Sequence, residues 1–550
     1  MNPVRRLRLS AIVAVLLGAS MALSGCGTSA APTSSTADGT ADSTAVITAN
    51  NTEPGAGLIP GSTADTAGWK VVTLLFDGLV TFSNTGDLVM ADAKSITPSK
   101  DASVYTITLK PNLQFSNGEK ITASTYAKAW SFSANAANGQ TGAAIFSTIK
   151  GYDDLQDKNS DKDAQLSGLK VINDTTLQVT LAAPDSSFAY KVGDVAFMPL
   201  PSVAYKDITA FGRNPIGNGP YTFESWTHNE EIKLKANSKY AGPRKPANGG
   251  ITFKIYSDLD AAYADAEAGN LDLLDQVPTS ALSTYKNDPD IKAIDKVGPG
   301  FKSLTIPQSL KHFSGEEGRL RRKAISMAIN RDQLTRKILL GSATPATDFT
   351  APQIAGYSDT LDSDKVLVYN ATEAKKLWEQ ANEISAWSGD FEISYAGDTT
   401  DKDWVDAVAN SLKNALGINA KSVPFPTSKE LSTAILNRTV GTAFKSGMQS
   451  DYPHPEGYLV QAYGSDFADG KGLNNGDYKS DEFDSLISQA ATQTDLSEAE
   501  KTYQKAEKVL LKDLPVIPLW YANVNAATSK EVSNVEINYM GFPQYYKVTK

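Results

Sequence analysis

The residue types that most enzymes use for nucleophilic or metal-assisted chemistry are scarce in this sequence. Its 550 residues contain three histidines, His228, His312 and His454, and a single cysteine, Cys26. None of the spacings typical of paired metal ligands, activated serines or phosphate-binding loops occurs. Carboxylate pairs that act as general acid and base follow no spacing rule, so the 62 acidic residues leave a hydrolase open. The pattern lowers the expectation of an enzyme without excluding one.

Cys26 follows a segment with the composition of an export signal. A start with three arginines precedes the apolar stretch 9–23, which has the length of a signal peptide and is too short for a stable membrane span. The run Leu-Ser-Gly-Cys at 23–26 resembles the bacterial lipobox, in which the cysteine receives a diacylglycerol. We therefore expect residues 1–25 to be a signal peptide, Cys26 to be lipidated, and the protein to lie on the extracellular face of the cell membrane.

The composition after the expected cleavage site argues against nucleic acid as a partner. Removing three arginines and no acidic residue changes the formal net charge from −10 to −13. No cluster of Lys and Arg alternates with aromatic residues, as phosphate binding requires. Residues 26–44 are rich in Gly, Ser, Thr and Ala, so we expect a flexible tether there.

Strand and helix patterns alternate along the rest of the chain, which predicts an α/β or mixed fold. Alternating apolar residues predict strands at 105–109 and 176–181. Apolar residues at spacings of three and four predict helices at 320–340, 402–416 and 498–511, with Gly341 and Gly417 ending the first two and Ser497 capping the third. We expect the basic residues at 321–331 to lie on the solvated side of their helix.

Eight short motifs occur in a fixed order over some 450 residues. They are Leu-Phe-Asp-Gly-Leu at 75–79, the strand and Asn-Gly turn at 105–118, Ile-Thr-Ala at 121–123, Asn-Gly-Pro-Tyr-Thr-Phe at 218–223, Ala-Gly-Asn-Leu-Asp at 268–272, the basic helix at 320–331, Asp-Tyr-Pro-His-Pro at 451–455 and Pro-Val-Ile-Pro-Leu-Trp-Tyr at 515–521. In this order they resemble the extracellular solute-binding proteins, family 5, of oligopeptide and dipeptide ABC importers.

The resemblance implies an α/β fold of the type II periplasmic-binding class, with two lobes joined by a hinge and an extra domain inserted in the first lobe. The implied boundaries are 45–75, 201–300 and 521–550 for lobe I, 76–200 for the additional domain, and 301–520 for lobe II. The hinge is expected at two crossovers, near 300–301 and 520–521. The family resemblance further implies a monomer that catalyses no reaction, needs no cofactor or metal, and delivers peptides to an ABC permease and ATPase complex.

The family's motifs also imply a ligand site in lobe II. Asp451 matches the aspartate that holds a peptide's α-amino group. Lys445 and Met448 stand where some relatives carry an arginine that meets the peptide carboxylate and a tryptophan. A lysine lacks the bidentate fork of arginine, so we expect a looser grip on that carboxylate. Four aromatic residues complete the expected cleft wall or belong to the core: Phe301, Phe425, Trp520 and Tyr521.

Other ligands and other classes remain open from the sequence. Within the superfamily, the ligand could be a dipeptide, a nickel chelate, an opine or an oligosaccharide, although three histidines disfavour metal. An exported hydrolase would turn over a fluorogenic peptide or glycoside. A lipoprotein chaperone or adhesin would bind unfolded protein without closure of the lobes.

Overall fold

The computed structural model describes residues 42–550. The predicted signal peptide, Cys26 and nearly all of the predicted tether lie outside the described residues. No helix within residues 42–550 combines the length and apolar character that a membrane span requires.

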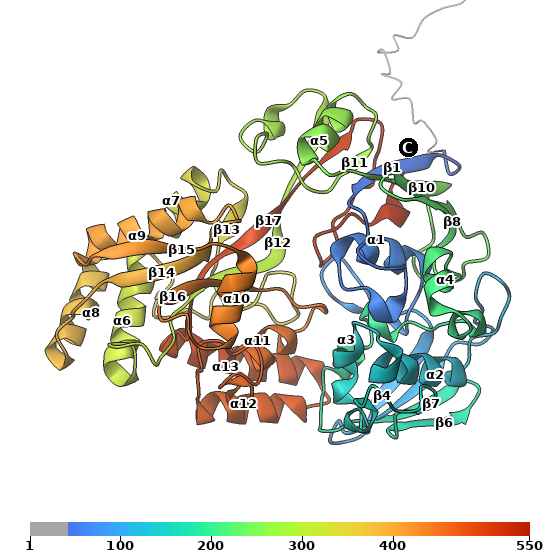
Figure 1. Cartoon of the computed structure of the whole chain (residues 1–550), viewed down its shortest axis with the longest axis horizontal. Coiled ribbons are helices and arrows are strands. Elements are labelled where there is room, and N and C mark those ends of the chain that lie inside the picture. Colours follow the sequence, from blue (N-terminus) through green and yellow to red (C-terminus); the bar gives the residue numbers. More distant parts are fainter. Residues whose placement is uncertain (1–41) are drawn as a thin grey trace, which may run out of the picture. The chain divides into compact units, whose positions relative to one another are not determined.

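One mixed sheet of eleven strands forms the framework of the protein (Figure 1). Parallel and antiparallel pairs both occur in it, because connections through helices alternate with hairpins. Its strands run in the order β15 (Ala420–Phe425), β14 (Phe391–Ala396), β16 (Ala443–Met448), β12 (Ile291–Thr305), β17 (Val516–Ser529), β11 (Leu273–Leu274), β1 (Val46–Asn51), β10 (Gly250–Ile255), β9 (Glu231–Ala236) and β8 (Tyr221–Thr227), and β13 (Ala343–Pro345) adds to β17.

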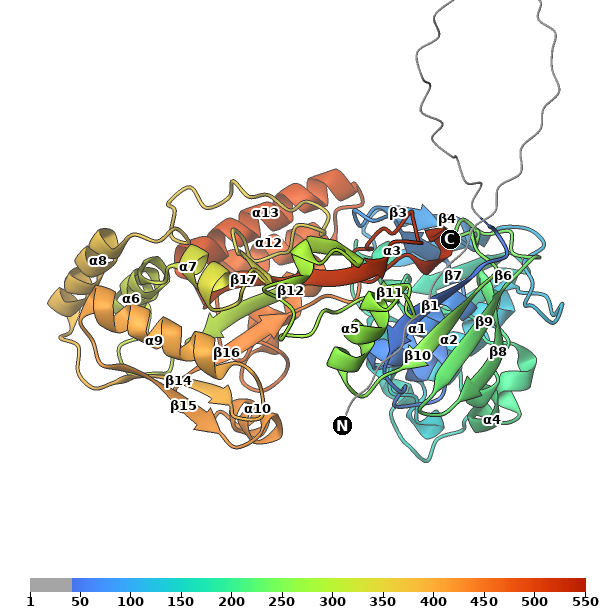
Figure 2. The same ribbon diagram turned by 90° about the horizontal axis from the view of Figure 1, so that it is seen from above.

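Three separate hydrophobic clusters lie along this framework and divide the chain into two lobes. The first lobe holds the largest cluster and a small third one, drawn from residues 47–291 and 527–548 together with Tyr452. The second lobe holds the remaining cluster, drawn from residues 301–521. The strands β12 and β17 run side by side from one lobe into the other, as Figure 2 shows. The two expected crossovers, at 300–301 and 520–521, lie within these continuous strands.

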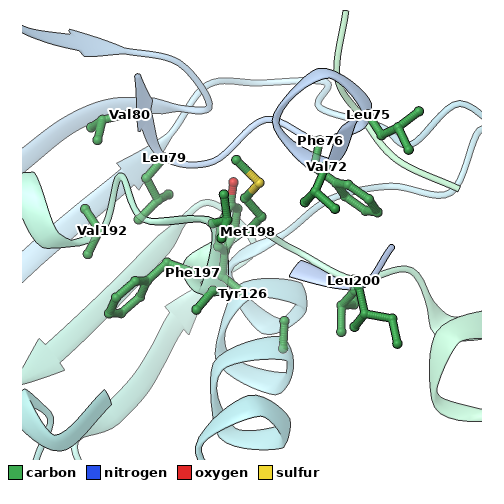
Figure 3. Packing of buried hydrophobic residues seen from close by; sticks show 14 of the residues in the cluster. Val72, Leu75, Phe76, Leu79, Val80, Tyr126, Val192, Phe197, Met198 and Leu200 are labelled. Carbon is green, nitrogen blue, oxygen red and sulfur yellow. The ribbon is translucent and has the colours of Figure 1, made fainter. Parts of the chain in front are cut away.

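The first lobe carries a second, four-stranded sheet that shares its core. This sheet has the order β4 (Ala93–Pro98), β5 (Val104–Leu109), β7 (Thr176–Thr180) and β6 (Leu169–Asn173), and a hairpin of β2 (Val80–Phe82) and β3 (Leu88–Met90) lies beside it in the chain. Side chains on both sides of the junction are in one cluster (Figure 3). Val72 and Phe76 from one side and Tyr126 and Phe197 from the other are all members of it. The helices of this lobe are α1 (Thr66–Leu75), α2 (Ala123–Ala134), α3 (Phe188–Lys191), α4 (Ile208–Arg213) and α5 (Leu259–Glu267).

The second lobe places helices around its part of the sheet (Figure 1). These are α6 (Gly315–Ala328), α7 (Arg331–Lys337), α8 (Ala371–Ile384), α9 (Lys402–Leu416), α10 (Ser428–Leu436), α11 (Glu456–Tyr463), α12 (Asp481–Ala491) and α13 (Leu496–Asp513). The predicted helix 402–416 is confirmed as α9, and Gly417 ends it in the left-handed conformation with φ 69°. The helix predicted over 498–511 is longer, and Asp495 rather than Ser497 caps it.

The single helix predicted over 320–340 is wrong, because two helices meet there. The chain is extended at Ile329, and the side chain of Asn330 accepts a hydrogen bond of 3.0 Å from the backbone N–H of Gln333. This N-cap starts α7 anew. The apolar spacing continues through the break because both helices cover the same core, so periodicity alone could not reveal it.

The expectation that the basic residues at 321–331 lie in solvent is also wrong. Arg321, Arg322 and Arg331 are 0%, 3% and 3% exposed. The guanidinium of Arg321 lies 4.5 Å and 5.1 Å from the ring centroids of Trp378 and Trp387. The guanidinium groups of Arg322 and Arg331 donate hydrogen bonds to backbone carbonyls. Planar arginine tolerates such burial because its flat faces stack on aromatic rings while its edges donate hydrogen bonds.

Candidate functional site

An acidic cavity of about 480 Å³ lies between the lobes. The first lobe lines it with the start of α1, the segments 142–145 and 194–196, and the aromatic and apolar side chains Trp69, Met540 and Phe542. The second lobe contributes Gln449 and Asp451. Three aspartates border this space, and none of its lining residues is Lys, Arg or His. Its charge therefore suits a cationic group of a ligand.

Asp451 offers a carboxylate without a hydrogen-bond donor among residues 42–550. It lies three residues beyond the end of β16, and its backbone carbonyl accepts a hydrogen bond of 3.2 Å from the hydroxyl of Tyr539. This contact reaches from the first lobe and fixes the backbone without occupying the side chain. The carboxylate keeps contact with solvent, yet the surrounding protein removes enough water to raise its pKa.

Asp194 faces the same cavity from the first lobe. It caps the short 3-10 helix Val195–Phe197, and its Oδ1 accepts a hydrogen bond of 2.8 Å from the backbone N–H of Ala196. Burial raises its pKa to about 7 against this hydrogen bond, and the charge of Asp451 adds to the rise. The third aspartate, Asp65, differs because both of its oxygens accept backbone N–H groups, of Gly55 and Gly68.

A second cavity, of about 430 Å³, lies in the second lobe and carries lysines. Gln449 borders both cavities. The ammonium of Lys445 forms an ion pair with Asp401, which also accepts a hydrogen bond from Trp404. Within residues 42–550 no carboxylate lies within ion-pair distance of Lys302. Burial, together with the positive charge of Lys445, lowers the pKa of Lys302.

The residues predicted from the sequence divide between the cavities and the core. Asp451 borders the acidic cavity, while Lys445, Met448 and Trp520 border the lysine cavity. In contrast, Tyr521 and Phe301 are each 1% exposed and pack in the second-lobe core. The hydroxyl of Tyr521 is occupied there by the backbone of Asp348, at 3.1 Å and 3.2 Å. Phe425 ends the outermost strand, β15, and borders neither cavity.

Asp194, Lys302 and Gln449 are among the residues that border the cavities and that sequence reasoning missed. An aspartate before a short helix indicates a cap, and Asp194 is one. Its position opposite Asp451, which only the folded chain reveals, also makes it a candidate for binding a cationic group. Gln449 could have been suspected, because it lies two residues before Asp451 in the loop that follows β16.

No group of three metal-ligating side chains occurs within the part of the chain that the structure describes. The three histidines lie apart and are engaged elsewhere. His228 contacts Glu53 at 2.6 Å and His312 contacts Glu317 at 2.7 Å. His454 is 1% exposed, and burial lowers its pKa to about 3.

Comparison with known proteins defines the class. The chain matches the bacterial extracellular solute-binding proteins, family 5, over residues 87–470, and it belongs to that family. Members of this family are transport receptors, so this protein is a solute-binding receptor and not an enzyme.

Particular relatives extend over nearly the whole chain. The chain is 26% identical to a dipeptide-binding protein of Lactococcus lactis subsp. cremoris, covering 84% of this chain and 87% of the relative. It is 26% identical to the oligopeptide-binding protein OppA of Bacillus subtilis, covering 93% of each. The solved structure of the periplasmic murein tripeptide binding protein MppA, in its unliganded open form, superposes with a TM-score of 0.80 at 20% identity, over 92% of this chain and 98% of that one. This likeness confirms the two-lobed α/β fold.

Proposed function

We propose that this protein captures peptides between its two lobes and delivers them to the permease of an ABC importer. Family membership supports a receptor, and relatives named for dipeptides and oligopeptides support peptides as the ligand class. One observation on the chain itself carries the proposal. Carboxylates without cationic partners border one cavity, lysines border the other, and Gln449 lies at both. A peptide with free termini carries the complementary charges at its two ends.

The acidic cavity receives the α-ammonium group of the peptide in this proposal. Asp451 is the principal contact, because its carboxylate is free of internal donors. A charge-assisted hydrogen bond between ammonium and carboxylate is about twice as strong as a neutral one. Every unmodified peptide has this group, so the contact gives affinity without selecting a sequence.

The lysine cavity receives the carboxylate end in this proposal. Lys445 already has Asp401 as a partner, so the peptide carboxylate must compete for it. Lys302 lacks such a partner and supplies the freer positive charge. Trp404 and Trp520 provide apolar wall beside these charges. We therefore expect the carboxylate end to be held more loosely than the amino end.

Closure of the lobes on the peptide follows from the two connecting strands. The two lobes have separate cores, drawn mainly from residues 47–291 and 527–548 in the first and from 301–521 in the second, and β12 and β17 join them. A ligand that contacts both lobes stabilises the closed arrangement over the open one.

Calorimetry with defined peptides tests the ligand class, and small-angle scattering tests closure. We expect saturable binding of tri- to pentapeptides with free termini, and a smaller radius of gyration when peptide is bound. Native mass spectrometry of protein purified from cells should show a series of co-purifying peptide masses. A single co-purifying mass that is no peptide, together with no heat from any peptide tested, would exclude peptides as the ligand class.

The proposal places the receptor outside the cell membrane, held there by a diacylglycerol on Cys26. The lipobox-like run and the tether composition of residues 26–44 support this anchor. Two acyl chains give stable retention where one gives only marginal binding. Cys26→Ser should leave peptide affinity unchanged and release the receptor from the membrane fraction. Wild-type retention of the variant in that fraction would contradict the anchor.

A further inference from the structure

The segment that carries Asp451 leaves the core of its own lobe and enters the other. Tyr452 is 8% exposed and belongs to the first-lobe cluster. Phe444 before it is buried in the second lobe, and Tyr458 and Leu459 after it belong to the second-lobe cluster. The loop 449–455, together with Glu456 at the start of α11, is therefore a second junction between the lobes, separate from β12 and β17.

A buried lysine of the first lobe binds this loop. Lys191, the last residue of α3, has its Nζ 2.8 Å from Oδ2 of Asp185 and 3.1 Å from Oε1 of Glu456. The side chains of the three residues are 14%, 13% and 13% exposed. The hydroxyl of Tyr452 donates a hydrogen bond to the other oxygen of Glu456. Burial alone would lower the pKa of Lys191, but the two carboxylates raise it, so the lysine is charged.

Further contacts join the two lobes at the same junction. The ring of His454 lies 4.9 Å from that of Tyr190 in the first lobe and 5.3 Å from that of Tyr503 in the second. The hydroxyl and N–H of Ser186 donate to the carbonyls of Ala490 and Ala491 at the end of α12, at 2.8 Å and 2.9 Å. Figures 1 and 2 both show α3 facing the ends of the second-lobe helices.

The ion pair between Lys191 and Glu456, called the ion bridge below, lies close in sequence to two residues of the acidic cavity. Lys191 precedes Asp194 by three residues, and Glu456 follows Asp451 by five. The bridge thus joins the two short segments that carry the two facing carboxylates of the acidic cavity. Because its groups are mostly buried, this ion bridge is screened by solvent much less than an exposed pair, and separating the two segments would also separate the aromatic rings packed around it.

We propose that Lys191 is a positioning residue, which holds Asp451 opposite Asp194 across the lobe boundary before any peptide arrives. The inference rests on the proposed function, since it assigns Asp451 to the peptide's α-amino group. It makes the amino end of the site preformed, at a junction that stays closed, while lobe movement completes the carboxylate end. A preformed site loses less conformational entropy on binding.

The test compares a free tripeptide with its N-acetylated form, because their ratio of dissociation constants reports recognition of the amino group alone. In wild type we expect a ratio of about 100. Glu456→Gln keeps the shape of the side chain and leaves Lys191 paired with Asp185. We expect it to lower the ratio to about 10 or less, chiefly by weakening the free peptide.

Two further variants separate positioning from general stability. Glu317→Gln removes a glutamate of equal burial, 15% against 13% exposed, from an ion pair inside the second lobe with Arg321. It should lower the melting temperature and leave the ratio unchanged. Lys191→Arg keeps the charge, so the ratio of dissociation constants should stay close to that of wild type. Lys191→Met removes the charge and should lower the ratio as Glu456→Gln does.

The outcomes distinguish this inference from the proposed function. Equal affinity of wild type for free and acetylated peptide would overturn the assignment of Asp451 to the amino group and with it this inference, whereas no binding of either peptide would contradict the proposed function itself. Discrimination by wild type that persists in Glu456→Gln and Lys191→Met would overturn only the positioning role. If Lys191→Met does not fold, the ratios of Glu456→Gln and Lys191→Arg still decide whether Lys191 has the positioning role.

Discussion

Two carboxyl groups of this protein, Asp194 and Asp348, have pKa values raised to about 7 by burial, and their surroundings differ. Asp194 borders a cavity of about 480 Å³ and accepts one backbone N–H. Asp348 is 0% exposed beneath β17 and borders none of the cavities described above. One faces space that a ligand can fill, and the other faces protein on every side.

The hydrogen bonds around Asp348 account for the difference. Its Oδ1 accepts the N–H of Phe349 at 2.8 Å, and Thr350 contacts both Asp348 and Glu507, at 3.4 Å and 2.8 Å. Glu507, which is 1% exposed, also has a raised pKa through burial and the nearby charge of Asp348. When Asp348 and Glu507 share a proton, their carboxyl groups find hydrogen-bond partners within the protein. A raised pKa therefore reports burial, and only a cavity with a free acceptor makes such a group a candidate for binding.

The largest effect should come from Asp451, which lacks internal donors. A bound peptide would cover this carboxylate; breaking a desolvated ion pair costs about 3 to 5 kcal/mol, whereas an exposed pair contributes about 0 to 1 kcal/mol. Asp451→Asn should therefore weaken free peptides by roughly 100-fold or more, at about 1.4 kcal/mol per decade. N-acetylated peptides should bind wild type poorly and lose little further in the variant. A coupling energy of zero from calorimetry on the four combinations would show that Asp451 makes no contact with the amino group.

A smaller effect should follow from the titration of Asp194. A cationic ligand favours the ionised carboxylate, so protonation below its pKa of about 7 opposes binding. We expect the affinity for a free peptide to fall about tenfold between pH 7.5 and pH 5.5. Asp194→Asn should flatten this dependence, measured with the same peptide so that its own titration cancels. An unaltered pH profile in the variant would remove Asp194 from the cationic site.

The smallest effect on binding should come from Asp348, within about twofold for Asp348→Asn at pH 7. Its effect should appear in stability instead. Its pKa is about 7 folded and about 3.9 unfolded, so the folded state holds a proton that the unfolded state releases. The contribution of this group to stability is complete below about pH 4 and is lost as pH rises to about 7, by up to about 1.4 kcal/mol per pH unit. Denaturant unfolding of wild type and variant measures this slope, and parallel profiles would contradict the assignment.

The sequence predicted the fold class because ordered motifs over most of the chain indicated the family. The α/β fold with two lobes is confirmed, and local signals located α9 to the residue because a glycine ends it. Burial of Arg321 could not be predicted, since the carbonyl of Ser385 that accepts from it and the rings of Trp378 and Trp387 come from distant parts of the chain. A charged residue in a helical pattern is predicted to be exposed to solvent unless such partners are known.

The candidate site was predictable only in its second-lobe half. Asp451 stands in a short motif, and its role remains a prediction. Asp194 and Lys191 belong to no motif, because their contribution depends on tertiary placement opposite Asp451 and Glu456. The four predicted aromatic residues show that residue type alone does not locate a side chain. Their type suits both a cleft wall and a core, and the structure places Tyr521 and Phe301 in the core and Trp520 at a cavity.

The discontinuous first lobe has a consequence for the order of folding. Its sheet needs Leu273 to pair with Thr528, and its main core needs Val532, Tyr545 and Val548 from the C-terminal segment. As the chain emerges from the ribosome, that core stays incomplete until those residues are available, whereas the second-lobe core draws only on residues 301–521. Contacts of such long sequence separation form late. We therefore expect the core formed by residues 47–273 to be completed only after the C-terminal segment has been synthesised.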